Sequence, residues 1–181
     1  MKITKMKIPD VLLIEPKLYG DERGFFFESY NKSLFKQYGI PLEFVQDNHV
    51  LSACGVLRGL HYQRGLQAQA KLVRVICGSV FDVAVDIRKG SPTLGKHIAV
   101  TLRAADHQIL YVPAGFAHGY CALEDGTEVL YKVSSLYSPP DEAGIVWNDP
   151  VLAIQWPRLG ADYKVSGKDS ALPTLKELEP V

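Results

Sequence analysis

The chain has no excess charge of either sign and no long apolar run. Its 20 Lys and Arg residues are matched by 20 Asp and Glu residues. A balanced charge gives no global field that favours nucleic acid or an anionic membrane, so we expect neither as a partner and any anion site to be local. The longest apolar run near the N-terminus, Val11–Ile14, is too short for a signal peptide, and no run approaches a membrane span.

Cysteine is scarce, and the usual signatures of nucleophilic and phosphate-loop chemistry are missing. Cys54, Cys77 and Cys121 are odd in number, scattered, and form no CxxC pair. This usage predicts reduced, mostly buried thiols in a cytoplasmic protein. A glycine-rich phosphate loop and a Ser or Cys nucleophile motif are both missing from the sequence. Acyl transfer and P-loop chemistry are therefore not expected.

The length and composition predict one globular domain over residues 1–181. The apolar fraction of 47% and the charged fraction of 22% are ordinary for a protein with a core of its own. Repeats, low-complexity tracts and linkers are absent. Short apolar or alternating segments, separated by Gly, Pro, Asn and Asp, predict a mainly β domain. Closing many short strands into a sandwich or barrel would remove exposed sheet edges.

The strand predictions follow the apolar and alternating segments. They are Val11–Pro16, Gly24–Ser29, Glu43–Val50, Val56–Gln63, Lys71–Cys77, Ser79–Arg88, Lys96–Leu102, His107–Val112, Gly119–Ala122, Thr127–Val133 and Gly144–Val146. In the clearest of them, Ser79–Arg88, an apolar face alternates with a face that carries Asp82 and Asp86. These two carboxylates are expected either to line a pocket behind the reactive groups or to face water.

Two short helices are predicted outside the strands. The first covers Asn31–Tyr38 and is ended by Gly39 and Pro41. The second covers Ser170–Glu179, close to the end of the chain.

The most informative cluster joins Arg58, His61 and Lys71 within fourteen residues. A guanidinium can hold a phosphate, an imidazole can move a proton, and an ammonium can stabilise an oxyanion. In a regular strand Arg58 and His61 point to opposite faces, because side chains alternate. Both can reach one ligand only if the chain bulges or bends near Gly59, which glycine permits. A regular ladder that left Arg58 outside the pocket would contradict its phosphate role.

Two segments resemble the paired motifs of the cupin barrels. The first runs from Gly55 through His61 to Gly78, and the second is the run from Pro113 to His118. The resemblance implies an all-β protein, a cupin or jelly-roll barrel with a few short peripheral helices.

The same comparison implies that no metal is bound. Metal-binding cupins carry a second His where this chain has Gln63, and a Glu where it has Lys71. An ammonium has no lone pair to give and repels a cation. His61 and His118 alone are too few for an ordinary protein metal site.

A narrower resemblance runs in order over nearly the whole chain. It is carried by Gly20–Ser29, Phe44–His49, Arg58–His61, Ala68–Arg74, Phe81–Arg88, Gly115–Gly119, Tyr131–Lys132, Trp147–Pro150 and Ser166–Asp169. Together these segments resemble the dTDP-4-dehydrorhamnose 3,5-epimerase family. That family inverts C3 and C5 of a dTDP-linked 4-keto-6-deoxy sugar as a homodimer, without a cofactor, on the route to dTDP-L-rhamnose. The resemblance implies the same activity here, with an N-terminal segment at the dimer interface and subunits that lend residues to each other's sites.

The reaction needs a base, an oxyanion stabiliser and an acid, because both stereocentres lie next to the C4 ketone. His61 suits the base, since its ordinary pKa of about 6.5 lies near working pH. By resemblance, Asp169 orients His61, Lys71 lies beside the C4 oxygen, and Tyr131 is the acid across the sugar. Without the resemblance the same residues would be a structural His, an edge-strand Lys, a core Tyr and an Asp in a turn or at a helix N-cap.

Substrate-binding residues also come from the resemblance. Arg23 and Arg58 match phosphate positions. Phe26, Glu28 and Tyr137 are candidates for contact with the nucleotide base, and Gln46, Asn48 and His118 match positions nearer the sugar or phosphate. Phe25, Phe26 and Phe27 cannot all face a pocket, so at least one is expected in the core.

Other readings remain open at the level of sequence. The closest is a related sugar-nucleotide cupin, either a single-centre epimerase or a 3,4-ketoisomerase. The choice depends on the shape of the pocket and the position of the acid, and Tyr131 favours an epimerase. A metal-dependent cupin oxygenase would use His61 and His118. A non-catalytic barrel would bind the sugar nucleotide without exchanging its protons.

Overall fold

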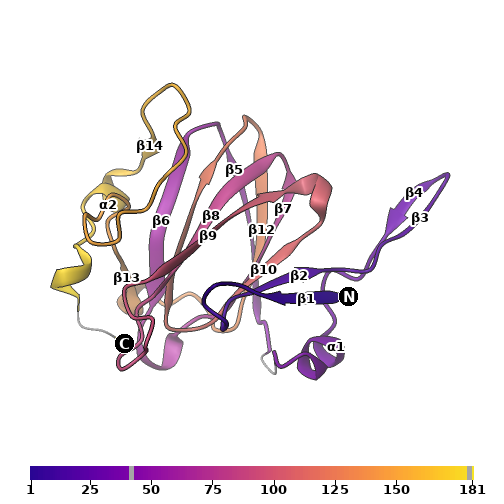
Figure 1. Cartoon of the computed structure of the whole chain (residues 1–181), viewed down its shortest axis with the longest axis horizontal. Helices are drawn as coiled ribbons and strands as arrows, with labels where there is room; N and C mark the ends of the chain where they lie inside the picture. The colour runs from indigo at the N-terminus through magenta and orange to yellow at the C-terminus, as the bar shows by residue number, and fades with distance from the viewer. Residues whose placement is uncertain (41–42, 179–180) are drawn as a thin grey trace.

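The computed structural model describes residues 1–40, 43–178 and 181. Two sheets pack face to face and enclose the interior of a barrel (Figure 1). The first has the strand order β1 (Lys2–Lys5), β2 (Leu12–Glu15), β10 (Ile109–Val112), β7 (Lys71–Cys77), β12 (Thr127–Val133), β5 (Gln46–Ser52). The second has the order β13 (Glu142–Gly144), β6 (Val56–Gln63), β11 (Phe116–Ala122), β8 (Ser79–Asp86), β9 (His97–Arg103), and β14 (Lys164–Val165) adds parallel to β6.

The core between the sheets is built from the inward-facing side chains of both. Val73 and Val129 from the first sheet meet Val80, Ala84 and Phe116 from the second. Strand β8 is buried on both faces, because its other side packs under the segment that follows β13. This arrangement is the cupin-like jelly-roll barrel that the sequence predicts.

Several predicted strands have the right limits, whereas others are shifted or were missed. Val56–Gln63, Lys71–Cys77 and Thr127–Val133 are confirmed residue for residue. Strands β1, β14 and β3 (Tyr19–Asp21) were not predicted, and the last predicted strand, Gly144–Val146, is displaced because the strand is Glu142–Gly144. Short strands at a sheet edge carry little periodicity, so pattern alone does not find them.

One of the two predicted helices is confirmed. Helix α1 (Lys32–Gln37) begins where the Asn31 side chain accepts a hydrogen bond from the Leu34 amide, and its Phe35 packs on the outer face of the first sheet. Pro41, predicted to end it, lies outside the described residues. Helix α2 (Gly167–Ser170) was not predicted.

The predicted helix Ser170–Glu179 is wrong. Ser170 is the last residue of α2, and the rest of the described part forms only a 3₁₀ turn at Leu175–Glu177, while Glu179 lies outside the described residues. Pro173 has no amide hydrogen and disfavours a helical residue before it, which interrupts the run. Further 3₁₀ turns lie at Gly65–Gln67, Ala104–Asp106 and Pro139–Asp141.

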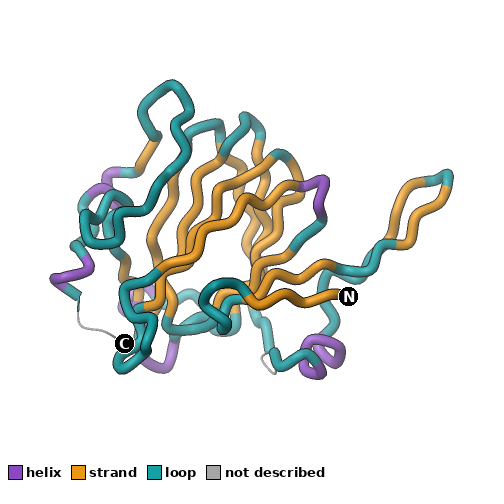
Figure 2. The backbone as a smooth tube through the Cα atoms, viewed as in Figure 1, coloured by secondary structure: helices purple, strands orange, loops and turns teal. Residues whose placement is uncertain are grey.

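A hairpin of β3 (Tyr19–Asp21) and β4 (Gly24–Phe26) projects away from the barrel (Figures 1 and 2). We call residues 18–28 the arm. Phe25 and Phe26 on the arm are 60% and 64% exposed, and Phe27 is partly buried beside His107. The expectation that one of these phenylalanines lies in the core is therefore wrong. The predicted strand Gly24–Ser29 ends early, at Phe26, because the arm has no sheet to join.

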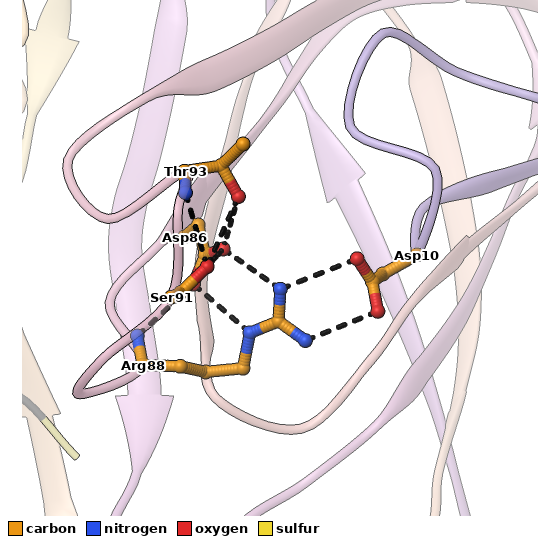
Figure 3. Close-up of polar contacts among 5 residues, drawn as sticks. All are labelled: Asp10, Asp86, Arg88, Ser91 and Thr93. Carbon is orange, nitrogen blue, oxygen red and sulfur yellow. Dashed lines mark hydrogen bonds and ion pairs between the residues drawn. The ribbon is translucent and has the colours of Figure 1, made fainter.

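A polar network around Asp86 ties the loop between β1 and β2 to the end of β8 (Figure 3). Asp86 is fully buried and accepts hydrogen bonds from Arg88 Nη2 at 2.7 Å and from Ser91 Oγ and Thr93 Oγ1 at 2.6 Å each. Arg88 also pairs with Asp10 at 3.1 Å. Burial alone raises the pKa of Asp86, but the hydrogen bonds from Arg88, Ser91 and Thr93 hold it well below its ordinary value. Asp86 thus faces neither a pocket nor water.

The three cysteine thiols are free, but only Cys121 is buried, so the prediction of mostly buried thiols is wrong. Within the described residues, no helix combines the length and the apolarity needed to cross a membrane.

Candidate active site

The barrel interior holds two adjoining cavities that share three reactive side chains. The first, here the reaction cavity, has a volume of about 340 Å³ and contains Arg58, His118 and Asp169. The second, here the outer cavity, has a volume of about 230 Å³. His61, Lys71 and Tyr131 line both cavities. Their side chains therefore meet where the two spaces join.

His61 is held by Asp169, which arrives from helix α2. The Ser166 hydroxyl accepts a hydrogen bond from the Asp169 amide and begins that helix. Asp169 Oδ1 lies 3.0 Å from His61 Nε2, and Oδ2 accepts the Gly59 amide at 2.9 Å. With Nε2 engaged, Nδ1 is the ring nitrogen that can take a proton from a substrate.

The charges around His61 set it up as a base. Burial lowers the pKa of His61, the Asp169 carboxylate raises it, and the Lys71 ammonium lowers it, with a net decrease. Burial raises the pKa of Asp169, but the Gly59 amide and His61 bring it below its usual value. At neutral pH the pair is thus a neutral imidazole beside an ionised carboxylate.

Strand β6 carries the bulge that the sequence required at Gly59. His61 pairs with His118 and Arg58 pairs with Tyr120, so a step of three residues on β6 faces a step of two on β11. Gly59 has a φ of 118°, and a Cβ there would lie 2.7 Å from the Gly119 Cα. A glycine is needed for both reasons. The extra residue brings Arg58 into the reaction cavity together with His61, so the predicted bulge is confirmed.

Lys71 supplies a buried positive charge at the start of β7. Its side chain is only 8% exposed, and Nζ donates to the His61 carbonyl at 3.3 Å. Burial lowers the pKa of Lys71 to about 8, against the opposing charges of Asp82 and Glu142. The ammonium is therefore still the main form at neutral pH, and it is poorly solvated.

His118 and Asp82 form a second imidazole–carboxylate pair in the same interior. His118 Nε2 lies 2.9 Å from Asp82 Oδ1, and both side chains are buried. Asp82 thus lies behind the pocket wall, where it fixes the His118 ring and raises the pKa of Lys71. The alternative in which Asp82 faces water is wrong.

Tyr131 enters the interior from the first sheet, whereas His61 comes from the second. Burial raises the pKa of Tyr131, and the Arg58 charge opposes this. The phenol therefore keeps its proton at neutral pH and can act as a donor.

The outer cavity contains a chain of polar groups that reaches the surface. Gln46 Nε2 donates to Asn48 Oδ1 at 2.9 Å, and Gln46 Oε1 accepts the Tyr137 amide at 3.0 Å. The Tyr137 hydroxyl and Lys168 Nζ both donate to Glu142 Oε2 at 2.6 Å. Lys168 and Glu142 were not predicted as site residues. Lys168 adjoins Asp169 in a segment that carried the resemblance, whereas nothing in the pattern points to Glu142.

Comparison with known proteins explains why these groups converge. A model of the family described as dTDP-4-dehydrorhamnose 3,5-epimerase matches residues 5–177. The chain belongs to this family. It is 52% identical to the dTDP-4-dehydrorhamnose 3,5-epimerase of Salmonella typhimurium over 98% of this chain and 97% of that protein. It is 56% identical to the Pseudomonas aeruginosa protein of the same name over 87% of each.

Solved structures agree with the sequence relatives. The crystal structure of dTDP-6-deoxy-D-glucose-3,5-epimerase from Legionella pneumophila, in complex with dTDP-4-keto-L-rhamnose, superposes with a TM-score of 0.94 at 46% identity. The match covers 98% of this chain and 94% of that chain. The cupin-like fold is thus shared by members of the epimerase family.

Not all of the predicted site residues of this family member lie together. Nine line the two cavities: His61, Tyr131, Lys71, Asp169, Gln46, Asn48, Arg58, His118 and Tyr137. Arg23, Phe26 and Glu28 are instead on the exposed arm, where Arg23 pairs with Asp21. The interior of one chain is therefore assembled without the arm residues.

Gln63, at one of the two altered cupin positions, has a structural role in this epimerase family member. Gln63 Nε2 donates to the Gln67 and Leu136 carbonyls at 2.7 and 3.1 Å, and its Oε1 accepts the Ser138 amide at 2.8 Å. It fastens two loops together. Among the described residues, no three His, Cys, Asp or Glu side chains lie close enough to share a metal ion.

Proposed function

We propose that this protein is a cofactor-independent isomerase that inverts C3 and C5 of dTDP-4-keto-6-deoxyglucose, as a dTDP-4-dehydrorhamnose 3,5-epimerase. The observation that carries the proposal is the convergence of a His–carboxylate pair, a buried ammonium and a phenol on one interior space. The relatives at 52% and 56% identity bear that name.

Each inversion is one deprotonation and one reprotonation. His61 takes the proton from C3 or C5, the C–H electrons form the enolate double bond, and the negative charge moves to the C4 oxygen. The Lys71 ammonium stabilises that oxyanion, a contribution of about 3 kcal/mol for a preorganised donor. Tyr131 then gives its proton to the opposite face, and the ketone reforms. Asp169 keeps the correct tautomer of His61 and stabilises its protonated form.

Substrate binding is divided between the two cavities. Arg58, at the mouth of the reaction cavity, is placed to hold the diphosphate as a charged donor, and His118 lies nearer the sugar. Gln46, Asn48 and Tyr137 line the outer cavity and are assigned to the rest of the nucleotide.

We also propose that the protein is a homodimer in which the arm of one subunit covers the cavity of the other. Arg23 and Phe26 are exposed, far from their own site, and an extended arm with bare aromatic rings is unstable in water without a partner surface. Arg23 would then add a second guanidinium for the diphosphate, while Phe26 and Glu28 would contact the base of the nucleotide.

Mixing two inactive variants tests this arrangement. Arg23→Ala and His61→Ala subunits are refolded or expressed together and the hybrid dimer is isolated. If the arm acts in trans, one site of the hybrid has every wild-type residue, and activity returns to about half of the wild-type value per dimer. If Arg23 serves its own subunit, the hybrid stays inactive.

The activity is tested by incubating the protein with dTDP-4-keto-6-deoxyglucose in deuterium oxide and following C3 and C5 separately. The proposal expects deuterium at both centres together with the doubly inverted product. Label at one centre only would identify a single-centre epimerase. Binding of dTDP without any exchange would identify a non-catalytic barrel.

We further propose a cytoplasmic location and a site without metal or cofactor. The exposed free thiol of Cys77 agrees with a reducing compartment, and Lys71 repels a cation beside His61. Metal analysis of the purified protein, before and after chelation, is the test. Stoichiometric metal whose removal abolishes activity would favour the oxygenase alternative.

A further inference from the structure

The hydroxyl of Tyr120 has no hydrogen-bond partner among the described residues, although it is buried. Tyr120 lies on β11, two residues beyond His118, and is 4% exposed. Buried polar atoms in native proteins nearly always have a partner, so an orphaned hydroxyl calls for a reason. None of the proposed steps described above uses this residue.

The position of Tyr120 directs attention to Tyr131. Tyr120 belongs to the interior core cluster, and Tyr131 packs against that cluster. Both side chains line the reaction cavity. The Tyr120 oxygen itself is closed off from solvent. Neither water nor substrate reaches it in this conformation, so its partner during the reaction has to be a protein group.

Two hydroxyls are available nearby, and one is already engaged. Ser52 lies close enough to Tyr120 for a weak polar contact between the two hydroxyls, but that contact falls short of hydrogen-bond geometry. Ser52 Oγ instead accepts Arg58 Nε at 3.3 Å. The Asp82 carboxylate also acts on Tyr120, but it is held by His118 Nε2 at 2.9 Å. The other hydroxyl close to Tyr120 is that of Tyr131.

Both tyrosines are protonated in the resting protein. Burial raises the pKa of Tyr120 to about 12, and Arg58 opposes the shift. Burial likewise raises the pKa of Tyr131. When Tyr131 gives up its proton in the proposed reaction, its oxygen becomes a phenolate in a poorly solvated place. That charge needs a donor which the neutral phenol did not need.

We propose that Tyr120 is a positioning residue whose hydroxyl donates a hydrogen bond to the Tyr131 phenolate formed when the enolate is protonated. The Tyr131 O–H bond breaks, the enolate electrons form the new C–H bond, and the C4 carbonyl reforms. Tyr120 keeps its own proton throughout. At rest the Tyr120 hydroxyl has no partner, and the Tyr131 phenolate, a stronger acceptor than the neutral phenol, draws this donor toward it. This inference rests on the proposed role of Tyr131.

The test compares Tyr120→Phe with the wild type in deuterium oxide, measuring product formation and deuterium in recovered substrate. Proton removal by His61 does not involve Tyr120, whereas protonation by Tyr131 does. Tyr120→Phe is therefore expected to lower kcat by about tenfold or more, the effect of one hydrogen bond to a charged group. KM, dTDP affinity and thermal stability stay at wild-type values, and the ratio of exchange to product rises by the same factor.

A double-mutant cycle with Tyr131→Phe gives a second readout. If Tyr120 acts through Tyr131, Tyr120→Phe has no further effect in the Tyr131→Phe background. Tyr111→Phe, on the outer side of the first sheet, is the control for loss of a tyrosine hydroxyl elsewhere.

Three results overturn the inference. They are a wild-type kcat in Tyr120→Phe, a parallel loss of exchange and product, or a change confined to KM. If Tyr131→Phe itself forms product normally, the proposed acid is wrong, and this failure is distinct from a failure of Tyr120 alone.

Discussion

Replacing Lys71 by Met is expected to make the protein more stable and almost inactive. Lys71 is buried, and the fall of its pKa from 10.5 to about 8 corresponds to about 3 kcal/mol of folding free energy that the ammonium costs at pH 7. Met fills similar space without a charge and escapes that cost. The same change removes the proposed oxyanion stabiliser, so kcat should fall by a factor on the order of 10² to 10³.

The sign of the pH dependence is fixed by which state holds the proton. Between pH 8 and 10.5 the unfolded chain keeps a proton on Lys71 that the folded chain has lost. The wild type therefore gains stability as the pH rises through this window. Met does not titrate, so the advantage of Lys71→Met is largest below pH 8 and shrinks toward pH 10.5.

Urea unfolding of both proteins at pH 7 and pH 9.5, at one protein concentration, measures the difference. Lys132→Met is the matched control, because Lys132 lies on the neighbouring strand in a surface pair with Asp47. The control is expected within about 1 kcal/mol of the wild type at both pH values. A Lys71→Met protein that is less stable than the wild type at pH 7, or that keeps its activity, would refute the reasoning.

Three further predictions concern the residues around this centre and the far end of the barrel. Asp169→Asn should lower kcat by at least about a hundredfold. The Asp169 carboxylate raises the pKa of His61, so its removal should lower that pKa and shift the acid limb of kcat/KM to lower pH. An upward shift of that limb in the pH–rate profile would contradict this. Asp86→Asn should lower the free energy of unfolding in urea at pH 7 by about 2 kcal/mol and leave kcat normal. The hydrogen bonds to Asp86 stabilise its ionised form, so the difference in stability from the wild type should shrink as the pH falls below 3.8. An equal difference at pH 7 and pH 2.5 argues against the assigned network. Gly59→Ala should cost at least about 2 kcal/mol and most of the activity, because its Cβ meets Gly119 at 2.7 Å; calorimetry and kinetics that match the wild type would show that β6 needs no bulge there.

The sequence predicts the central strands well because their information is local. Val56–Gln63, Lys71–Cys77 and Thr127–Val133 combine apolar periodicity with glycine or proline boundaries, and each is confirmed at both ends. Errors appear where the local signal conflicts with the surroundings. The run Ser170–Glu179 reads as a helix, but Pro173 interrupts it. At least one of Phe25, Phe26 and Phe27 was expected in the core, but the three rings lie on a projecting arm.

Some residues of the candidate site could be predicted from the sequence, and others could not. His61, Arg58 and Lys71 could be singled out by residue type and spacing, and the need for a bend at Gly59 follows from strand geometry alone. Asp169 could not be paired with His61 without the family resemblance, since 108 residues separate them and its own surroundings predict a turn or cap. Glu142 and the orphaned Tyr120 hydroxyl have no signature at all in the sequence.

By itself, the sequence determined the mainly β class, the limits of three central strands and the chemical types of the reactive groups, because periodicity and residue chemistry are local properties. Only the tertiary structure decided which of those groups meet. It placed His61 and Tyr131 on different sheets around one interior, brought α2 against β6 so that Asp169 reaches His61, and left the arm outside its own cavity. Contacts between distant segments depend on how the two sheets pack, and that packing is a property of the whole chain.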